Sequence, residues 1–167
     1  MLFDKFKQVK AFVFDVDGVL SNGEILLTEK GEQLRSFNIK DGYAMQLAVK
    51  KDYPMAIITG GSSIGIRRRM EGLGISDVFT GVDDKTAVFS AWLSLRGLSP
   101  CDILYMGDDM PDFANMKTAG LAACPADAVP EIKAVAHYIS SFNGGMGAAR
   151  DVIEKVMKLH GAWVHNN

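Results

Sequence analysis

The chain has 167 residues, of which 48% are hydrophobic, and a formal net charge of -2 at pH 7. This length is enough for one domain with a buried core, and the near-neutral charge argues against binding to nucleic acid or to a membrane surface. The two cysteines form no metal-ligand pattern, and neither a signal peptide nor an apolar run of membrane-spanning length is visible, which predicts a cytoplasmic protein that acts on small solutes.

The first predicted strand, over residues 11–14, is a fully apolar run that ends directly at two carboxylates, Asp15 and Asp17. Side chains alternate along an extended chain, so the two acids would share a face if the strand continued as far as Asp17. Two carboxylates that close repel each other unless a cation or a shared proton compensates their charge. An Asx-rich turn at the end of the strand explains the pair equally well, so the choice depends on the segments that follow.

A β-hairpin is predicted next, over residues 24–38, because two apolar stretches flank a turn-like break at residues 29–32. Leu26 and Leu27 stand side by side on this hairpin, which indicates an apolar face that seeks a partner. The alternative is that the hairpin folds back on its own sheet. A helix is expected after it, over residues 42–51.

The second strand of the sheet, over residues 55–58, ends at Thr59 and Gly60, just before a helix over residues 63–73. A small residue lets the backbone approach a phosphate closely, and the start of a helix offers free N–H groups and the positive end of its dipole. This segment is therefore a candidate anion site.

The rest of the chain alternates short strands with helices. Lys85 opens one amphipathic helix, and three acids, Asp108, Asp109 and Asp112, follow the apolar strand over residues 102–106. The other expected strands cover residues 78–80, 121–124 and 138–139, and the expected helices cover residues 85–95, 110–119 and 147–159.

This order of elements predicts an α/β fold with a three-layer, Rossmann-like parallel sheet, helices on both faces and a β-hairpin insertion. Ligands of such sheets bind outside the carboxyl ends of the strands, so the acids, Thr59 and Lys85 are expected to meet in one crevice. The set suits a phosphoryl group beside Mg²⁺, because this cation prefers oxygen ligands and because the threonine and the lysine can bind phosphoryl oxygens. One acid can then attack phosphorus while its neighbour protonates the departing oxygen.

Four short sequences in this order resemble the four motifs of the haloacid dehalogenase superfamily of phosphohydrolases: DVDGV at 15–19, Thr59-Gly60, Lys85 and GDDMPD at 107–112. The resemblance extends from residue 12 to about residue 150. It implies that Asp15 is the nucleophile that forms an aspartyl-phosphate and that Asp17 is first the general acid and then the general base. The implied ligands of the phosphoryl group are Thr59, Gly60 and Lys85. Those of Mg²⁺ are Asp15, Asp17 through its carbonyl, and Asp108, with Asp109 and Asp112 in supporting roles.

The whole chain, residues 1–167, would thus form a single phosphatase domain without the cap domain that closes the active sites of larger relatives. Between Asp17 and Thr59 it holds only the hairpin and one helix, and between Lys85 and Asp108 only a helix and a strand. Water would therefore reach the phosphoenzyme, and few side chains would contact the rest of a small substrate. Either the substrate is macromolecular or neighbouring subunits complete the site.

Within the superfamily the chain is most similar to the capless, tetrameric phosphatases of 2-keto-3-deoxy sugar acid phosphates, above all to those that act on 3-deoxy-D-manno-octulosonate 8-phosphate, a lipopolysaccharide precursor. Residues 37–42, 81–85 and 144–150 carry this similarity, together with Arg69 before residues 73–75. It implies a homotetramer assembled through the hairpins, and a glycine-rich tail, within about residues 143–160, that folds over a neighbouring site. The implied substrate-binding residues are Asn38, Lys40, Asp41, Gly42, Gly61 and Arg69.

One departure from that family's pattern concerns the substrate carboxylate, because many members have arginine where this chain has Gly61. One of the arginines at positions 67, 68 and 69 would then bind the carboxylate, or the substrate differs. A solvated helix face explains the three arginines equally well.

Three other functions fit parts of the sequence. A phosphatase for a nine-carbon 2-keto-3-deoxy sugar acid 9-phosphate would share every catalytic residue. A non-catalytic tetramerisation module would use the same hairpin, but the intact acids and Lys85 argue against lost chemistry. A phosphoacceptor signalling domain would place its acidic cluster before the phosphorylated aspartate, whereas here Asp15 precedes Thr59, Lys85 and Asp108.

Overall fold

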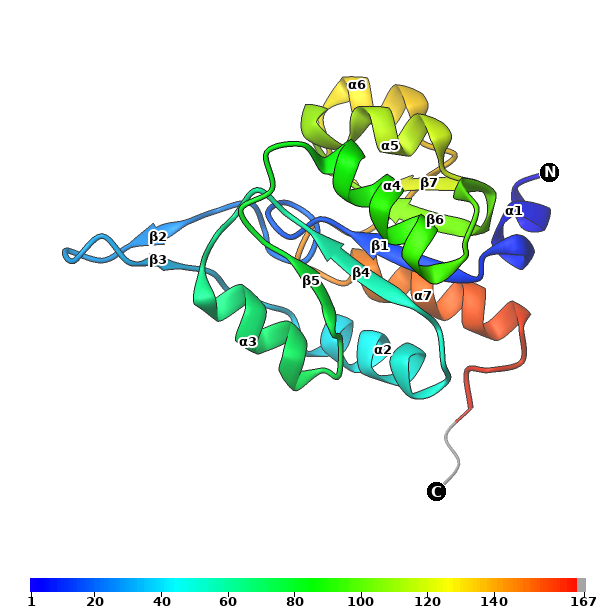
Figure 1. Cartoon of the computed structure of the whole chain (residues 1–167), viewed down its shortest axis with the longest axis horizontal. Helices are drawn as coiled ribbons and strands as arrows, with labels where there is room; N and C mark the ends of the chain where they lie inside the picture. Colours follow the sequence, from blue (N-terminus) through cyan, green and yellow to red (C-terminus); the bar gives the residue numbers. More distant parts are fainter. Residues whose placement is uncertain (165–167) are drawn as a thin grey trace.

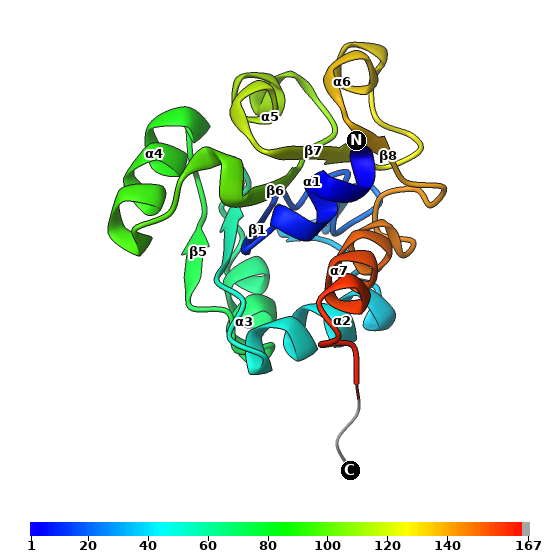
Figure 2. The same ribbon diagram turned by 90° about the vertical axis from the view of Figure 1, so that its right-hand side faces the viewer.

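The computed structural model describes residues 1–164 of the chain. Its centre is a six-stranded parallel sheet in the order β5-β4-β1-β6-β7-β8. Helices cover both faces of the sheet, which confirms the predicted three-layer α/β fold (Figure 1, Figure 2). The strands are β1 (Ala11–Phe14), β4 (Met55–Ile58), β5 (Asp77–Phe79), β6 (Ile103–Met106), β7 (Leu121–Cys124) and β8 (Tyr138–Ile139). The helices are α1 (Leu2–Gln8), α2 (Ile39–Lys50), α3 (Ile64–Gly72), α4 (Lys85–Arg96), α5 (Phe113–Thr118), α6 (Pro130–Val135) and α7 (Ala148–Leu159).

Burial on both faces of the sheet explains why its strands are unbroken apolar runs. Phe12 and Phe14 of β1 belong to a core with residues of α2, α3 and α7, whereas Ala11 and Val13 belong to a core with residues of α4, α5 and α6. Figure 2 shows these two groups of helices on opposite sides of the sheet. All four β1 side chains are fully buried, so this strand and the polar residues that follow it have a fixed position.

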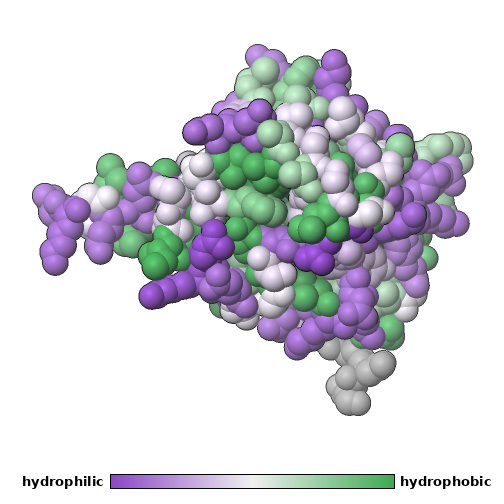
Figure 3. All heavy atoms as spheres, viewed as in Figure 1, coloured by the Kyte–Doolittle hydropathy of each residue, from purple (hydrophilic) through white to green (hydrophobic). Residues whose placement is uncertain are grey.

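The predicted hairpin lies outside the main sheet and projects from the body of the protein (Figure 1). Its ladder consists of β2 (Leu26–Leu27) and β3 (Gln33–Leu34) and is shorter than predicted, and a hydrogen bond from Thr28 N–H to Glu32 O closes the loop between the two strands. Leu26 and Leu27 are 68% and 64% exposed, so the hairpin does not fold back onto the sheet. Apolar surface lies among polar surface along this projection (Figure 3).

The structure contains two short helices, α1 and α6, that the sequence pattern does not predict. Residues 110–119 divide into a 3₁₀ turn, Met110–Asp112, and α5. Apart from α2 and α5, the other predicted elements of the sheet and its helices agree with the structure to within two residues. No helix within residues 1–164 is long and apolar enough to cross a membrane.

Another helix boundary differs at the start of α2, which begins at Ile39 and not at residue 42. Asn38 caps this helix, because its side-chain oxygen accepts hydrogen bonds from the N–H groups of Lys40 and Asp41. The segment that resembles the substrate-binding sequence of the sugar acid phosphatases therefore forms the first turn of a helix.

The glycine-rich segment before α7 packs against the turn that follows β1 in the same chain. Gly145 N donates to Val19 O at 2.8 Å, and a side chain at Gly144 would collide with the carbonyl oxygen of Gly18. The glycines thus permit a close approach between two backbones. Residues 144–147 are therefore anchored on the turn after β1 of their own chain, and the closure of a neighbouring site by this segment stays a prediction.

Gly144→Ala is expected to destabilise the protein by about 1–3 kcal/mol, because the backbone of Gly18 cannot retreat without moving the turn after β1. Gly72→Ala is the matched control, since Gly72 lies in α3 and no atom lies within 4 Å of the position its side chain would take. The control should raise stability by up to about 1 kcal/mol. Urea unfolding measures both variants, and a Gly144→Ala protein as stable as wild type would contradict this packing.

Candidate active site

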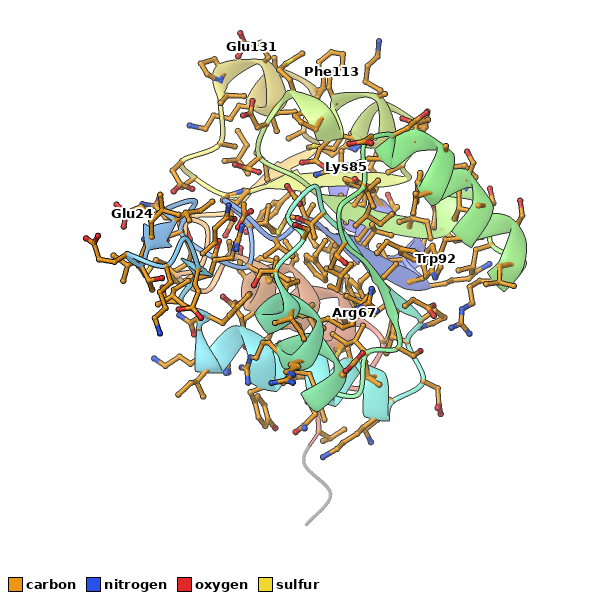
Figure 4. All side chains as sticks on the ribbon, turned by 60° about the vertical axis from the view of Figure 1, so that its left-hand side comes forward. Glu24, Arg67, Lys85, Trp92, Phe113 and Glu131 are labelled. Atoms are coloured by element: carbon orange, nitrogen blue, oxygen red, sulfur yellow. The ribbon has the colours of Figure 1, made fainter. Side chains whose placement is uncertain are left out.

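The residues with predicted chemistry meet at the edge of the sheet where β1, β4 and β6 end. From β1 the chain runs to β4 and β5 on one side and then to β6 on the other, and the crevice at such a reversal is the usual ligand site of an open α/β sheet. In Figure 4, Lys85 lies at the start of α4, and Arg67 lies on α3 at the other face of the sheet. A cavity of about 530 Å³ occupies the crevice. The predicted residues that line it are Asp15, Asp17, Thr59, Gly60, Gly61, Lys85, Asp108 and Asp109.

A buried polar network fixes the first of these acids. Lys85 Nζ lies 2.9 Å from Asp15 Oδ2 and 2.9 Å from Asp112 Oδ1. Tyr105 donates from its hydroxyl to Asp112 Oδ1 at 2.9 Å, and Asn115 Nδ2 donates to Tyr105 Oη and to Lys85 O. Neither Tyr105 nor Asn115 is predicted from the sequence pattern. The available signal is that a tyrosine inside an apolar strand needs a partner for its hydroxyl.

Burial and repulsion between carboxylates shift the pKa values of the ionisable groups in this network. Burial raises the pKa of Asp15 to about 7, repulsion from Asp112 adds to the rise, and Lys85 opposes it. Burial likewise raises the pKa of Asp108 to about 7, with further contributions from Asp112 and Asp109. Burial acts to lower the pKa of Lys85, but the attraction of Asp15 and Asp112 outweighs it and raises that pKa. The cluster therefore holds its lysine charged and has more carboxylates than the lysine can neutralise.

The same acids fit a divalent cation. Carboxylate oxygens of Asp15, Asp108 and Asp112 all lie within 4.8 Å of one another. Asp108 Oδ1 and Asp112 Oδ2 are buried and have no hydrogen-bond partner among the described residues. A hard cation with oxygen ligands would satisfy these orphaned atoms and offset the excess negative charge.

Two glycines make room for the carboxylates of this cluster. A side chain at Gly18, whose φ is +87°, would collide with the carboxylate of Asp108. A side chain at Gly107 would collide with the side chain of Asp112. The glycines next to the acidic motifs thus serve close packing as well as turning of the chain.

Thr59 lies directly after β4 and is 1% exposed. Its N–H donates to Phe79 O, which holds the end of β4 against β5, and its Oγ1 accepts a hydrogen bond from Gly61 N at 3.2 Å. These bonds fix the hydroxyl at the wall of the cavity, where its proton can be donated to an anion. Asp109, which also lines the cavity, is exposed and accepts a hydrogen bond from Met110 N.

Asp17 has a partner that the sequence analysis does not identify. Arg35, which follows β3 of the hairpin, donates from Nε to Asp17 Oδ1 at 2.6 Å and from Nη2 to Asp17 Oδ2 at 3.0 Å. The side chain of Asp17 is 30% exposed, against 10% for Asp15. The two acids therefore occupy different environments, as two different chemical roles require. A lone arginine in a polar hairpin carries no sequence signal for such a contact.

Most of the residues implied to bind substrate lie outside this cavity. Of the six, Gly61 lines it. Asn38 and Lys40 border a separate cavity of about 780 Å³ beside α7. Arg69 borders a third cavity, of about 620 Å³, between the hairpin and α3.

Asp41 and Gly42 make contacts that hold helices together. Asp41 is 2% exposed, and its carboxylate accepts hydrogen bonds from Gly147 N at 3.2 Å and from Arg150 N at 2.7 Å. Burial raises the pKa of Asp41, while these bonds act to lower it. A side chain at Gly42 would collide with the guanidinium of Arg69. These two residues therefore join the start of α2 to the start of α7 and to α3.

Comparison with known proteins supports the same chemistry. No protein-family model matches the chain. The 3-deoxy-D-manno-octulosonate 8-phosphate phosphatase of Escherichia coli (strain K12) is 36% identical over 157 residues, which cover 94% of this chain and 84% of that protein. The phosphatase of the same description from Yersinia pestis is 35% identical over 158 residues, covering 92% of this chain and 84% of that protein.

Solved structures agree with the sequence relatives. The crystal structure of the Yersinia pestis phosphatase has a TM-score of 0.94 and 32% identity, and the match covers 96% of this chain and 87% of that chain. The phosphatase of Moraxella catarrhalis, in complex with a magnesium ion, a phosphate ion and KDO, has a TM-score of 0.91 and 35% identity, with 95% of this chain and 91% of that chain covered.

The raised pKa values of Asp15 and Asp108 predict how stability depends on pH and on Mg²⁺. With a chelator present, the folded protein holds protons on these carboxyls between about pH 4 and pH 7, where the unfolded chain has lost them. The free energy of unfolding should therefore fall as pH rises through this range. Mg²⁺ binds the ionised carboxylates, so it should stabilise the protein more at pH 8 than at pH 5.

Asp108→Asn should weaken this pH dependence and remove most of the stabilisation by Mg²⁺, as measured by thermal unfolding with Mg²⁺ or with chelator. Asp83→Asn is the matched control, because Asp83 lines the same cavity but does not belong to the acid cluster. A wild-type response to Mg²⁺ in Asp108→Asn would contradict the assignment of the cation site.

Proposed function

Because the chain belongs to the haloacid dehalogenase superfamily and, within it, to the family of 3-deoxy-D-manno-octulosonate 8-phosphate phosphatases, we propose that it hydrolyses this eight-carbon sugar acid phosphate to the free sugar acid and inorganic phosphate. The observation that carries the proposal is the meeting of Asp15, Lys85, Asp112 and Asp108 at the edge where β1 and β6 end. The reaction would supply the sugar acid for lipopolysaccharide synthesis, and residues 1–167 would form one phosphatase domain.

In the proposed reaction, a carboxylate oxygen of Asp15 forms a bond to phosphorus as the bond from phosphorus to the sugar oxygen breaks. Asp17 gives a proton to the departing sugar oxygen. Asp17 then takes a proton from a water molecule whose oxygen attacks phosphorus, and the bond to Asp15 breaks to release phosphate. The 30% exposure of the Asp17 side chain, beside the buried Asp15, supports this division of roles.

The phosphoryl group would be bound by Thr59, Gly60 and Lys85, which line the same cavity as the two acids. Asp15, Asp108 and the carbonyl of Asp17 would hold Mg²⁺, with Asp109 and Asp112 in supporting roles. The cation would neutralise charge on the phosphoryl oxygens. Asp112 would also keep Lys85 in place for the phosphoryl group, as its 2.9 Å contact with that lysine supports.

The capless fold also supports a homotetramer in which neighbouring subunits complete the sites. Residues 18–58 hold no cap domain, and the hairpin exposes Ile25, Leu26, Leu27 and Leu34 to solvent. An exposed apolar surface of this kind favours association with another chain. A purely non-catalytic tetramerisation module would not require the buried network of Lys85 and its acids, which costs desolvation energy to form.

Kinetics on a panel of sugar phosphates with Mg²⁺ tests the proposed substrate. We expect kcat/KM to be highest for 3-deoxy-D-manno-octulosonate 8-phosphate and to fall by at least about tenfold for hexose phosphates, which lack the carboxylate. The panel includes a nine-carbon 2-keto-3-deoxy sugar acid 9-phosphate, since Gly61 departs from the arginine of many family members. A higher kcat/KM for the nine-carbon acid would replace the eight-carbon assignment.

The two opening acids should differ in their effects on leaving groups. Asp15→Asn should abolish turnover and formation of a phosphoenzyme, because an amide is a poor nucleophile. Asp17→Asn should slow hydrolysis of a sugar phosphate about 10²–10⁴-fold and that of 4-nitrophenyl phosphate far less, since only the sugar oxygen needs a proton. Steady-state and single-turnover kinetics measure both effects. Substantial Mg²⁺-dependent activity in Asp15→Asn would rule out the nucleophile.

A further inference from the structure

The arginine of the hairpin carries a buried donor without a partner. The side chain of Arg35 is 3% exposed, and its Nε and Nη2 are bonded to Asp17. Nη2 also donates to Gln33 Oε1 at 3.3 Å. Nη1 is buried and has no hydrogen-bond partner among residues 1–164. An unpaired guanidinium N–H is unfavourable in such a place, so the position favours an anionic ligand.

Arg35 connects two cavities. Its partner Asp17 lines the cavity of the catalytic acids, and Arg35 itself lines the cavity of about 620 Å³ between the hairpin and α3. Arg69 lines this second cavity as well. Glu32 is the carboxylate among its lining residues, and Glu32 Oε2 accepts a hydrogen bond from Thr28. Two guanidinium groups therefore border a space next to the catalytic acids.

Gly61 leaves the space that this arginine occupies. A side chain at Gly61 would lie 3.2 Å from Arg35 Nη2 and 3.2 Å from Asp17 Oδ2, which is tighter than ordinary packing. The φ of Gly61 is not positive, so its backbone conformation alone does not require a glycine. The glycine at position 61 therefore leaves room for the contact between Arg35 and Asp17.

This inference rests on the proposed function, in which Asp17 protonates the oxygen of the departing sugar. The phosphate-bearing end of the sugar then lies beside Asp17, and its carboxylate, at the opposite end of the sugar, would extend into the adjoining space that Arg35 and Arg69 border. We propose that Arg35 is the specificity residue that recognises the carboxylate of the sugar acid, with Nη1 as donor and Arg69 as the second cation of the subsite. A guanidinium group suits this role because its donors match the two oxygens of a carboxylate.

The test compares Arg35→Ala with wild type on three substrates in the presence of Mg²⁺. These are 3-deoxy-D-manno-octulosonate 8-phosphate, glucose 6-phosphate, which has no carboxylate, and 4-nitrophenyl phosphate, whose leaving group needs no proton. We expect kcat/KM for the sugar acid phosphate to fall at least about 30-fold, mainly because KM rises. The kcat/KM values for glucose 6-phosphate and 4-nitrophenyl phosphate should change less than about threefold. Arg35→Gln, which keeps most of the side-chain volume, should behave in the same way.

Arg67→Ala is the matched control, because Arg67, although the sequence offers it as one of three arginines for the carboxylate, lies on α3, donates to Thr80 Oγ1 and lines neither cavity. It should leave kcat/KM for all three substrates unchanged.

A loss of kcat/KM on both sugar phosphates that spares the aryl phosphate would assign Arg35 to the positioning of Asp17 and overturn the proposal. An equal loss on all three substrates in both Arg35 variants, with a lower melting temperature, would assign it a structural role and overturn it as well. A wild-type enzyme without preference for the sugar acid phosphate would instead refute the proposed function and, with it, this inference.

Discussion

The interaction on which the site depends is the burial of one ammonium group, that of Lys85, between the carboxylates of Asp15 and Asp112. The three residues come from the end of β1, the start of α4 and the 3₁₀ turn after β6, so the contacts form only when the sheet and its connections are assembled. Removal of one partner would leave another charge buried without compensation, which costs about 3–5 kcal/mol. The contacts that stabilise the folded protein therefore also fix the positions of Asp15, Lys85 and Asp112 in the crevice.

The excess of negative over positive side chains at the site explains why it needs a cation. Lys85 supplies one positive charge, whereas Asp15, Asp108 and Asp112 bring three carboxylates within reach of one another. Burial raises the pKa of Asp15 and of Asp108 to about 7, so neutral protonated carboxyls compete with the ionised forms near neutral pH when no cation is bound. A divalent cation held by these carboxylates would favour their ionised forms, and the proposed attack of Asp15 on phosphorus requires its ionised form.

The strands and their catalytic ends could be predicted from the sequence because a strand buried on both faces is an apolar run that stops at the first functional residue. Asp15 and Thr59 follow β1 and β4 directly. A sequence shows that a glycine is present but not which atom needs its space, so the close approach of Gly144 to the carbonyl of Gly18 could not be predicted. The role of Arg35 depends on the direction in which the hairpin leaves the sheet. That direction is set by tertiary contacts, which the local pattern of residues 24–38 does not contain.

The hairpin brings a side chain from outside the sheet to the acid cavity, because Arg35 donates two hydrogen bonds to Asp17. Arg35 follows β3 directly, and β3 pairs with β2, which carries the exposed Leu26 and Leu27. A contact that immobilises these leucines also restricts the backbone from which Arg35 reaches Asp17. The exposed leucines, which favour association, and Arg35, which is proposed to select the substrate, therefore belong to the same hairpin. Association through the hairpin would therefore lower the conformational entropy that Arg35 loses when it engages a substrate, which favours a preorganised site without any added domain.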